Sequence, residues 1–531
     1  MTAKPEKTMT SYSPEHTPAA PGPDPTSGDG PGGLTEEQRL AVGARVRRLN
    51  IEAGPGTGKT TVSARRFGVE RFAREYRGDP RAVVAVSFTR AATHTLVRRI
   101  RRLWGSHAIR WPHRVVTLDT VMVELLHDLL LTKLVVWPGG HTTLVVEDSW
   151  ASYGTRVRTF AQYKLTISGA EVQIGSARLH AAAYTVNPSR CASLIRQGIC
   201  THSDVRQVLA LALRRVEVRE YARKRFASRF RSFIVDEVYD ANDLDIDFIE
   251  LAVDGGVSVT LVGDDWQALY VFRGARPEVV PELLSRQGFR SLTLTRSFRW
   301  RSEEQAQLAD DLRGGIGVTL PVVLSADVPC LDVVLSLRWA PLWNLGPGVL
   351  PIGFQSFKGG PEEAAAILVL NHVTTSIFGT EATYVKDAVT SLSIDDEDFF
   401  VKAKPRLQQI VDVLSSDGTA TAKQQNVKTA YSHLGELLAE FSPRTLRPVR
   451  ANHTNRLRDI QARLLHPVRP VPGLTAHQAK GAEWNYVGVC LADAERALLH
   501  RGLHVEGDSD RKLYVACTRA CFSTAEVVVS S

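Results

Sequence analysis

The sequence predicts an α/β fold in which parallel strands are connected by helices. Two successive strand–helix units near the N-terminus predict this fold. The strand-like runs 49–53 and 82–88 each lead into a helical pattern. A glycine-rich turn joins the first of these strands to its helix. Two later apolar runs, 233–235 and 257–262, end in pairs of carboxylates and return the chain to the same sheet.

Composition limits the class of protein. The 531 residues are enough for two to four domains, and 44% hydrophobic with 23% charged residues excludes a fully disordered, fibrous or coiled-coil chain. We expect no transmembrane helix or membrane partner, no secretory signal, and six reduced cysteines, which together predict a cytoplasmic protein. The net charge of +8 favours a polyanionic partner such as nucleic acid, although a solvated arginine-rich surface would explain it equally well.

Composition and pattern also divide the chain. The first segment contains seven prolines and almost no large apolar residue, so it cannot bury enough surface to fold. Folded sequence begins at Leu34, where Thr35 and Gln38 have the spacing of a helical capping box. The predicted segments are a disordered tail at 1–33, a first domain at 34–110 and 216–290, a mainly helical insertion at 111–215, a second domain at 291–379 and 466–531, and an irregular or reduced insertion at 380–465.

The glycine-rich turn has the pattern of a phosphate-binding loop. Backbone N–H groups of such a turn surround phosphates at a helix N-terminus. Lys59 is expected to reach the β- and γ-phosphates, and the Thr60 hydroxyl to bind Mg²⁺. The strict pattern begins with glycine, and Ala53 takes that place here. The predicted nucleotide-binding residues of the loop are Gly54, Pro55, Gly56, Thr57, Gly58, Lys59, Thr60 and Thr61.

Asp236 and Glu237 directly follow the apolar strand 233–235. Such a pair suits Mg²⁺ binding by the first carboxylate and activation of the attacking water by the second. An acidic pair after a strand is by itself commonly a solvated strand end. Together with the upstream loop it predicts hydrolysis of a nucleotide, with ATP and Mg²⁺ as the expected cofactors.

The stretch Val259–Ala275 closely resembles motif III of the UvrD/Rep/PcrA-type superfamily-1 DNA helicases. Six further segments resemble motifs of that family in the family's order, and the set spans 34–520. They are the Q motif at 34–38, motif Ia at 87–92, motif II at 236–240, motif IV at 294–299, motif V at 475–484 and motif VI at 513–520. The resemblance implies a P-loop NTPase with two RecA-like domains and a nucleotide cleft between them.

The resemblance also implies roles at the nucleotide. Gln38 is expected to contact adenine, and Glu483 the nucleotide sugar. Gln267 matches the residue that senses the γ-phosphate. Arg299 and Arg519 match two arginine fingers, which would stabilise charge on the γ-phosphoryl group once the cleft closes.

A second set of residues is expected to contact single-stranded DNA. Tyr270 and Phe272 match aromatic residues that stack on bases, which suits sequence-independent binding, with core packing as the alternative. The basic run 98–102 would extend the DNA path or form a solvated helix face. The residues expected to face the phosphate backbone are Phe88, Thr89, Arg90, Thr475 and His477.

Some positions depart from the family pattern. Tyr239 stands where motif II usually has a glutamine that links phosphate to the neighbouring domain, so coupling of hydrolysis to DNA motion is an open question. The best match to motif Ib, 117–119, places an aspartate at a phosphate contact and is not assigned. Motif IV has Arg296 where glutamine is frequent.

The resemblance predicts an ATP-dependent helicase or translocase that moves 3′→5′ on single-stranded DNA or a tailed duplex. The alternative is a DNA-binding ATPase subunit of a repair or antiphage defence complex, which depends on a partner such as a nuclease or repair factor and unwinds little by itself. A small-molecule P-loop kinase would not need Tyr270, Phe272 or motifs V and VI. Pathway, oligomeric state and the ability to separate strands stay open.

Overall fold

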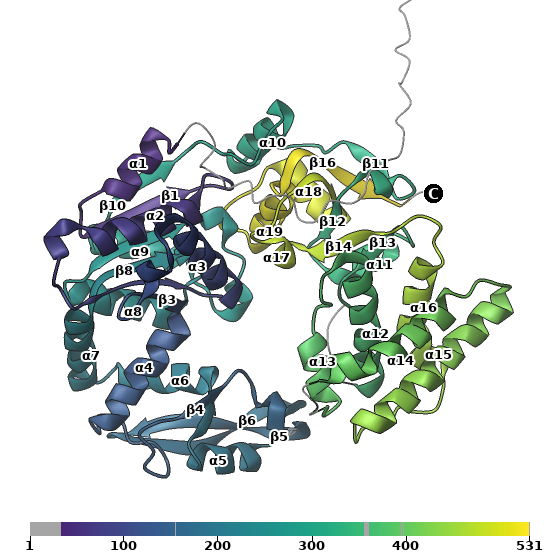
Figure 1. Ribbon diagram of the computed structural model, residues 1–531, viewed down its shortest axis with the longest axis horizontal. Coiled ribbons are helices and arrows are strands. Elements are labelled where there is room, and N and C mark those ends of the chain that lie inside the picture. The colour runs from purple at the N-terminus through teal and green to yellow at the C-terminus, as the bar shows by residue number, and fades with distance from the viewer. Residues whose placement is uncertain (1–32, 154–155, 355–359, 395, 397, 530–531) are drawn as a thin grey trace, which may run out of the picture.

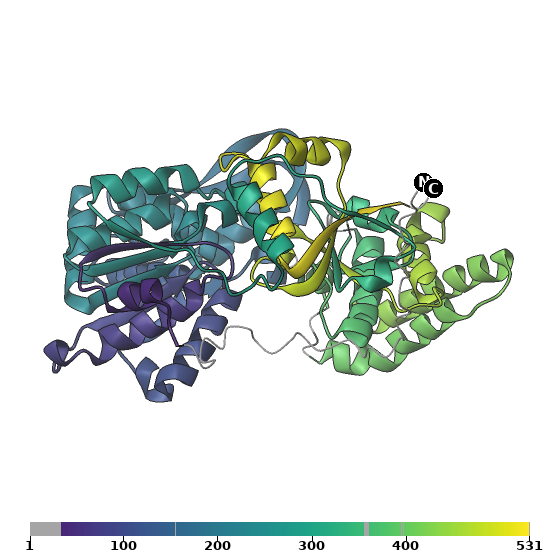
Figure 2. The ribbon, with the colours of Figure 1, turned by 90° about the horizontal axis from the view of Figure 1, so that it is seen from above.

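The computed structural model describes residues 33–153, 156–354, 360–394, 396 and 398–529. Figure 1 shows two sheet domains side by side, with one insertion below the first domain and a helical segment beside the second, and Figure 2 shows the same arrangement from above. The predicted tail at 1–33 lies, apart from Gly33, outside the described residues.

The first domain contains a six-stranded, fully parallel sheet in the order β10-β1-β9-β8-β2-β3. Its central strands β2 and β8 are buried along their whole length, as expected for a sheet covered by helices on both faces. Its strands are β1 (Arg48–Ala53), β2 (Ala82–Ser87), β3 (Arg114–Thr117), β8 (Phe230–Asp236), β9 (Ser258–Gly263) and β10 (Arg290–Leu294). Its helices are α1 (Glu36–Gly43), α2 (Lys59–Phe72), α3 (Arg90–Trp104), α7 (Val216–Arg229), α8 (Asp243–Asp254) and α9 (Val280–Arg286).

The second domain repeats this architecture, with the strand order β11-β16-β15-β12-β14-β13 and every pairing parallel. Two parallel sheets with crossover helices confirm the predicted fold class. Its strands are β11 (Val322–Leu324), β12 (Val333–Ser336), β13 (Val349–Pro351), β14 (Val471–Thr475), β15 (Trp484–Val489) and β16 (Ala520–Val528). Its helices are α10 (Glu303–Arg313), α11 (Trp339–Asn344), α17 (Ala476–Ala479), α18 (Asp493–Arg501) and α19 (Asp508–Cys517).

The boundary predicted between 290 and 291 is wrong by a few residues. Strand β10 pairs with β1, with Ile51 opposite Leu292, so residues 290–294 belong to the first sheet. Tertiary contacts decide which sheet this strand joins, so no local pattern marks the boundary.

The insertion predicted as mainly helical contains a long antiparallel hairpin, which corrects the prediction. Strands β5 (Arg156–Ser168) and β6 (Glu171–Val186) form it, and they pair along most of their length. Leu165 is buried, whereas its neighbours Lys164 and Thr166 are exposed. This alternation has the period of a strand, and it was the available signal. The remaining elements of the insertion are α4 (Leu118–Leu131), β4 (Val145–Glu147), α5 (Pro188–Arg196), β7 (Ile199–Thr201) and α6 (His202–Ala212).

The segment 380–465, for which the sequence predicts an irregular or reduced insertion, belongs to a helical bundle with its own apolar core. The bundle begins at Pro361, so the boundary predicted at 380 is too late. Helix α12 is apolar on nearly every side and therefore lies in the middle of the bundle, which periodicity alone did not indicate. The helices are α12 (Pro361–Phe378), α13 (Val385–Ser391), α14 (Phe399–Ser415), α15 (Ala420–Phe441) and α16 (Ala451–Leu464). In the described part of the chain, no helix has the length and apolarity needed to cross a membrane.

Candidate nucleotide site and nucleic-acid groove

The loop between β1 and α2 has the backbone of a phosphate-binding turn. Gly56 and Gly58 have φ values of +73° and +90°, which side-chain-bearing residues rarely adopt. A Cβ on Gly58 would lie 2.8 Å from Gln38 Nε2, so this glycine also makes room for its neighbour. Lys59 Nζ donates to the carbonyl of Ala53 at 3.0 Å and lies across the loop. The N-terminus of α2 lacks a capping side chain, which leaves its N–H groups pointing to where phosphates would lie.

Other loop residues are held by their surroundings. Gln38 Nε2 donates to the carbonyl of Thr57 at 2.9 Å, and Gln38 completes the predicted capping box with Thr35. Thr57 Oγ1 closes the turn onto the carbonyl of Gly54 at 2.9 Å. Thr61 is buried and accepts a hydrogen bond from an arginine on α3, so its side chain faces away from the loop.

Asp236 and Glu237 lie where β8 ends, beside the loop. Burial, reinforced by Glu237, raises the pKa of Asp236 to about 7. Asp236 Oδ1 has no hydrogen-bond partner among the described residues. Glu237 takes the left-handed backbone conformation at φ +63°, and its carboxylate lies 3.5 Å from Lys480 Nζ. A buried, unpaired carboxylate oxygen close to Lys59 of the loop fits a Mg²⁺ ligand, since a cation would supply the missing charge.

The second domain contributes two arginines to the same cleft. Arg299 binds Glu483 at 3.0 Å and the carbonyl of Thr518 at 3.0 Å. Arg519 Nη2 donates to Gln267 Oε1 across the domain boundary at 3.2 Å. Arg519 is fully buried, and its Nη1 has no partner among the described residues. The structure thus brings the predicted nucleotide residues of both domains together.

The electrostatics of the cleft suit an anion. Burial lowers the pKa of Lys59, although Glu237 and Asp264 oppose the shift. Burial, and then the charge of Arg299, lower the pKa of Arg519 to about 9. Buried cations that lack enough local anions favour binding of phosphates, so the donor set fits a nucleoside triphosphate.

Three functional candidates escaped sequence reasoning. Phe298 donates its N–H to the carbonyl of Gly56 at 3.0 Å, and its ring is 38% exposed beside the loop. An aromatic residue directly before Arg299 was a usable signal. Lys480, which binds Asp240 at 2.5 Å, lies within the segment matched to motif V, which was also a usable signal. Arg313 carried no signal, because only the fold brings α10 to the cleft.

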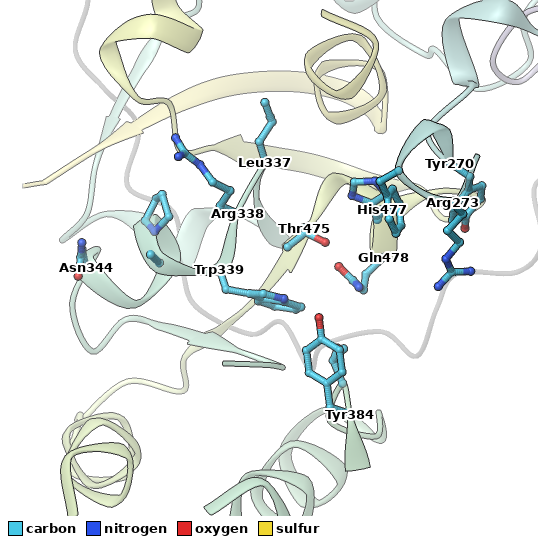
Figure 3. Close-up of a pocket in the computed structure, with 14 residues that line it drawn as sticks. Tyr270, Arg273, Leu337, Arg338, Trp339, Asn344, Tyr384, Thr475, His477 and Gln478 are labelled. Carbon is cyan, nitrogen blue, oxygen red and sulfur yellow. The ribbon is translucent and has the colours of Figure 1, made fainter. Parts of the chain in front are cut away.

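A groove of about 930 Å³ lies next to the cleft, between the two domains and the start of α13 (Figure 3). Tyr270, Phe272 and His477 form an aromatic cluster there, with Phe272 and His477 edge to face at 5.1 Å between ring centroids. Phe272 is 64% exposed, which rules out core packing for its ring. The groove is also lined by Arg273, Leu337, Arg338, Trp339, Ala340, Pro341, Asn344, Thr383, Tyr384, Thr475 and Gln478.

The motif Ia residues lie outside the lining of this groove. Phe88 packs against the core of the first domain, and Thr89 caps α3. Arg90 forms a two-point ion pair with Asp148 of the insertion, and both side chains are about two-thirds exposed. In the basic run on α3, Arg99 turns inward to Thr61, whereas most of the run is exposed.

Tyr239 is buried beneath the cleft. Its ring lies against the backbone of Gly263, where an added Cβ would approach it to 2.7 Å. Tyr239 borders a second cavity of about 210 Å³ together with Asp264 and Arg313. The departure from the motif therefore fills space under the end of β9, where Tyr239 lines the same cavity as Arg313 of the second domain.

The fold and the site define a P-loop NTPase with two RecA-like domains. Residues 34–136 and 156–286 match the family model described as the UvrD/REP helicase N-terminal domain. These residues, somewhat less than half of the chain, are similar to the UvrD/Rep-type superfamily-1A helicases.

Two similar relatives come from Escherichia coli (strain K12). The ATP-dependent DNA helicase Rep is 25% identical over 269 residues, which are 46% of this chain and 38% of Rep. DNA helicase II is 25% identical over 285 residues, 48% of this chain and 36% of the relative. The matches thus cover less than two fifths of either relative. A solved structure of Pif1 helicases at forked double-stranded DNA has 13% identity, a TM-score of 0.24 and 56% coverage of both chains.

Proposed function

We propose that the protein is an ATP-dependent DNA translocase and helicase that moves 3′→5′ on single-stranded DNA or a tailed duplex. The main support for the proposal is that one short segment, from the end of β9 to Gly274, reaches both the nucleotide cleft and the groove. Gln267, three residues before Tyr270, contacts Arg519 in the nucleotide cleft, and Tyr270 with Phe272 lines the groove. A nucleotide-dependent shift of this segment would move the stacking rings directly.

Lys480 makes a second link between the two sites. Its Nζ lies 3.5 Å from the Glu237 carboxylate and 5.3 Å from the centre of the Tyr270 ring. The carboxylate expected to activate water and a ring expected to stack on a base thus share one cation. The side chain comes from the second domain, so the contact depends on how the domains close.

The proposed chemistry assigns each residue one task. Lys59 and the α2 N-terminus bind the phosphates, while Thr60 and Asp236 would hold Mg²⁺. The metal would neutralise charge on the β- and γ-phosphates. Glu237 accepts a proton from the attacking water, and Gln267 contacts the γ-phosphate. Arg299 and Arg519 stabilise the transferring group, a contribution of ~10³–10⁵ in rate in related chemistry.

The groove suits a nucleic-acid strand without preference for sequence. Exposed aromatic rings offer stacking surfaces worth ~1–3 kcal/mol per base, and Arg273 and Arg338 supply positive charge for the backbone. The 3′→5′ direction is taken from the family resemblance. We place the motor's DNA track in this groove, with Thr475 and His477 beside the backbone.

The test compares unwinding of a 3′-tailed and a 5′-tailed duplex with ATP and Mg²⁺. The proposal predicts separation of the 3′-tailed substrate and loss of activity in Phe272→Ala. The matched control is Phe400→Ala, a 39% exposed ring on α14 away from the groove. Preference for the 5′ tail would contradict the direction, and unwinding only with an added nuclease or repair factor would favour the partner-dependent subunit.

A further inference from the structure

A third arginine of the second domain reaches the nucleotide cleft at Asp264. Arg313, the last residue of α10, donates from Nη1 to Asp264 Oδ1 at 3.0 Å. Its Nη2 lies 3.7 Å from Asp265 Oδ1. A Cβ added to Gly54 in the phosphate-binding loop would be 3.7 Å from Arg313 Nη1, so the guanidinium also lies beside the loop.

Asp264 connects Arg313 to Gln267, because it accepts a hydrogen bond from each. The Asp264 carboxylate is fully buried, and its other oxygen accepts a hydrogen bond from Gln267 Nε2 at 2.6 Å. Gln267 Oε1 in turn accepts from Arg519 Nη2 at 3.2 Å. Arg313, Asp264, Gln267 and Arg519 therefore form one continuous hydrogen-bond network. Its two arginines belong to the second domain, and Asp264 and Gln267 between them belong to the first.

A parallel path runs through aromatic rings. Arg313 Nη1 lies 3.3 Å from the hydroxyl of Tyr514 on α19. The Tyr514 ring packs on Trp266 at 4.9 Å between centroids. Trp266 directly precedes Gln267 and is buried in the apolar core of the second domain, although it belongs to the first. The turn at 264–267 is thus held to the second domain by an ion pair and by a buried indole.

We propose that Arg313 is a positioning residue that orients Gln267 through Asp264 and so makes γ-phosphate recognition depend on closure of the two domains. The inference rests on the proposed function, because it assigns regulation to the same nucleotide site. One N–H of the Gln267 side-chain amide donates to Asp264 and its oxygen accepts from Arg519, so its second N–H would be the donor to the γ-phosphate. Loss of Arg313 leaves the buried Asp264 carboxylate without its interdomain partner, so the amide loses its fixed orientation.

The experiment measures dissociation constants of the full chain for ADP and for the non-hydrolysable ATP analogue AMPPNP. Arg313→Gln is expected to lower the preference for AMPPNP over ADP about tenfold, the scale of one hydrogen bond to a charged group. Arg313→Lys, which can still reach Asp264, is expected to keep part of the preference. The matched control is Arg406→Gln, which breaks a 2.9 Å ion pair with Glu440 in the helical bundle and should leave both constants unchanged.

A double-mutant comparison separates positioning from general electrostatics. Once Gln267→Ala has removed the sensor, adding Arg313→Gln is expected to cause no further loss of preference. Equal weakening of both nucleotides, additive losses in the double variant, or a wild-type protein without preference for AMPPNP would overturn the inference. If Arg313→Gln lowers the preference for AMPPNP as expected but the wild type shows no DNA-stimulated hydrolysis, the positioning role of Arg313 is supported and the proposed function fails. If Arg313→Gln keeps the preference and DNA does stimulate hydrolysis in the wild type, only the positioning role is rejected.

Discussion

Asp236→Asn is expected to stabilise the nucleotide-free protein at alkaline pH while it removes a Mg²⁺ ligand. Burial is the main cause that raises the pKa of Asp236 from 3.8 to about 7, and Glu237 adds to it. The folded protein therefore holds a proton that the unfolded chain has already released between these pH values. Stability falls as pH rises through that window, because ionisation is disfavoured only in the folded state.

The magnitude follows from the two pKa values. A rise from 3.8 to about 7 corresponds to an upper limit of about 4 kcal/mol above pH 7. Relaxation around a buried charge lowers such a penalty, so we expect a gain of about 2 kcal/mol for Asp236→Asn at pH 8. At pH 5 the folded side chain is protonated whereas the unfolded one is largely ionised, so the same two pKa values give an upper limit of about 1.6 kcal/mol, well below the limit at pH 8.

Urea unfolding at pH 5 and pH 8, with a chelator and without nucleotide, measures this difference. The control is Asp79→Asn, because the hydrogen bond from Arg81 lowers the pKa of Asp79 and the variant should lose stability at pH 8. Mg²⁺ with ADP should stabilise the wild type and leave Asp236→Asn unchanged. An Asp236→Asn protein that is less stable than the wild type at pH 8, or a gain of equal size at both pH values, would refute the reasoning.

Three further changes test other parts of the structure. Arg273→Gln should weaken single-stranded DNA binding and reduce the slope of log Kd against log salt by about one, measured by fluorescence anisotropy; an unchanged slope would remove this side chain from the phosphate path. Lys480→Ala leaves the buried Asp240 without its cation and should lower the free energy of unfolding by about 3 kcal/mol in urea; a loss below about 1 kcal/mol would contradict the importance of the pair. Asp148→Asn releases the exposed Arg90 and should tighten DNA binding about two- to fivefold, whereas weaker binding would show that this ion pair assists the DNA.

Much of the nucleotide site could be predicted because its chemistry is local in the sequence. The loop at 54–61 needs glycines at positive φ next to a helix start, and Asp236 with Glu237 needs only the end of a buried strand. Both requirements leave contiguous signals. Arg313 left none, since it acts only after α10 is placed against the first domain.

The errors in the fold have equally physical causes. In the hairpin β5–β6 only one face of each strand is partly buried, so apolar residues alternate with polar ones and no continuous apolar run marks the strands. The sequence of strand β10 would suit either sheet, and only its pairing with β1 decides the domain boundary. The all-round apolar α12 has a weak periodic signal because its neighbours cover it on several sides.

Steady-state ATP hydrolysis with and without single-stranded DNA tests the central claim most directly, with Lys59→Ala as the inactive reference. We predict hydrolysis that DNA stimulates strongly and that the substitution abolishes, because Gln267 and the stacking rings share one short segment. Stimulation would also show that Tyr239 does not break the coupling. Hydrolysis that DNA leaves unchanged would contradict the coupling, and no hydrolysis in either condition would contradict an autonomous motor.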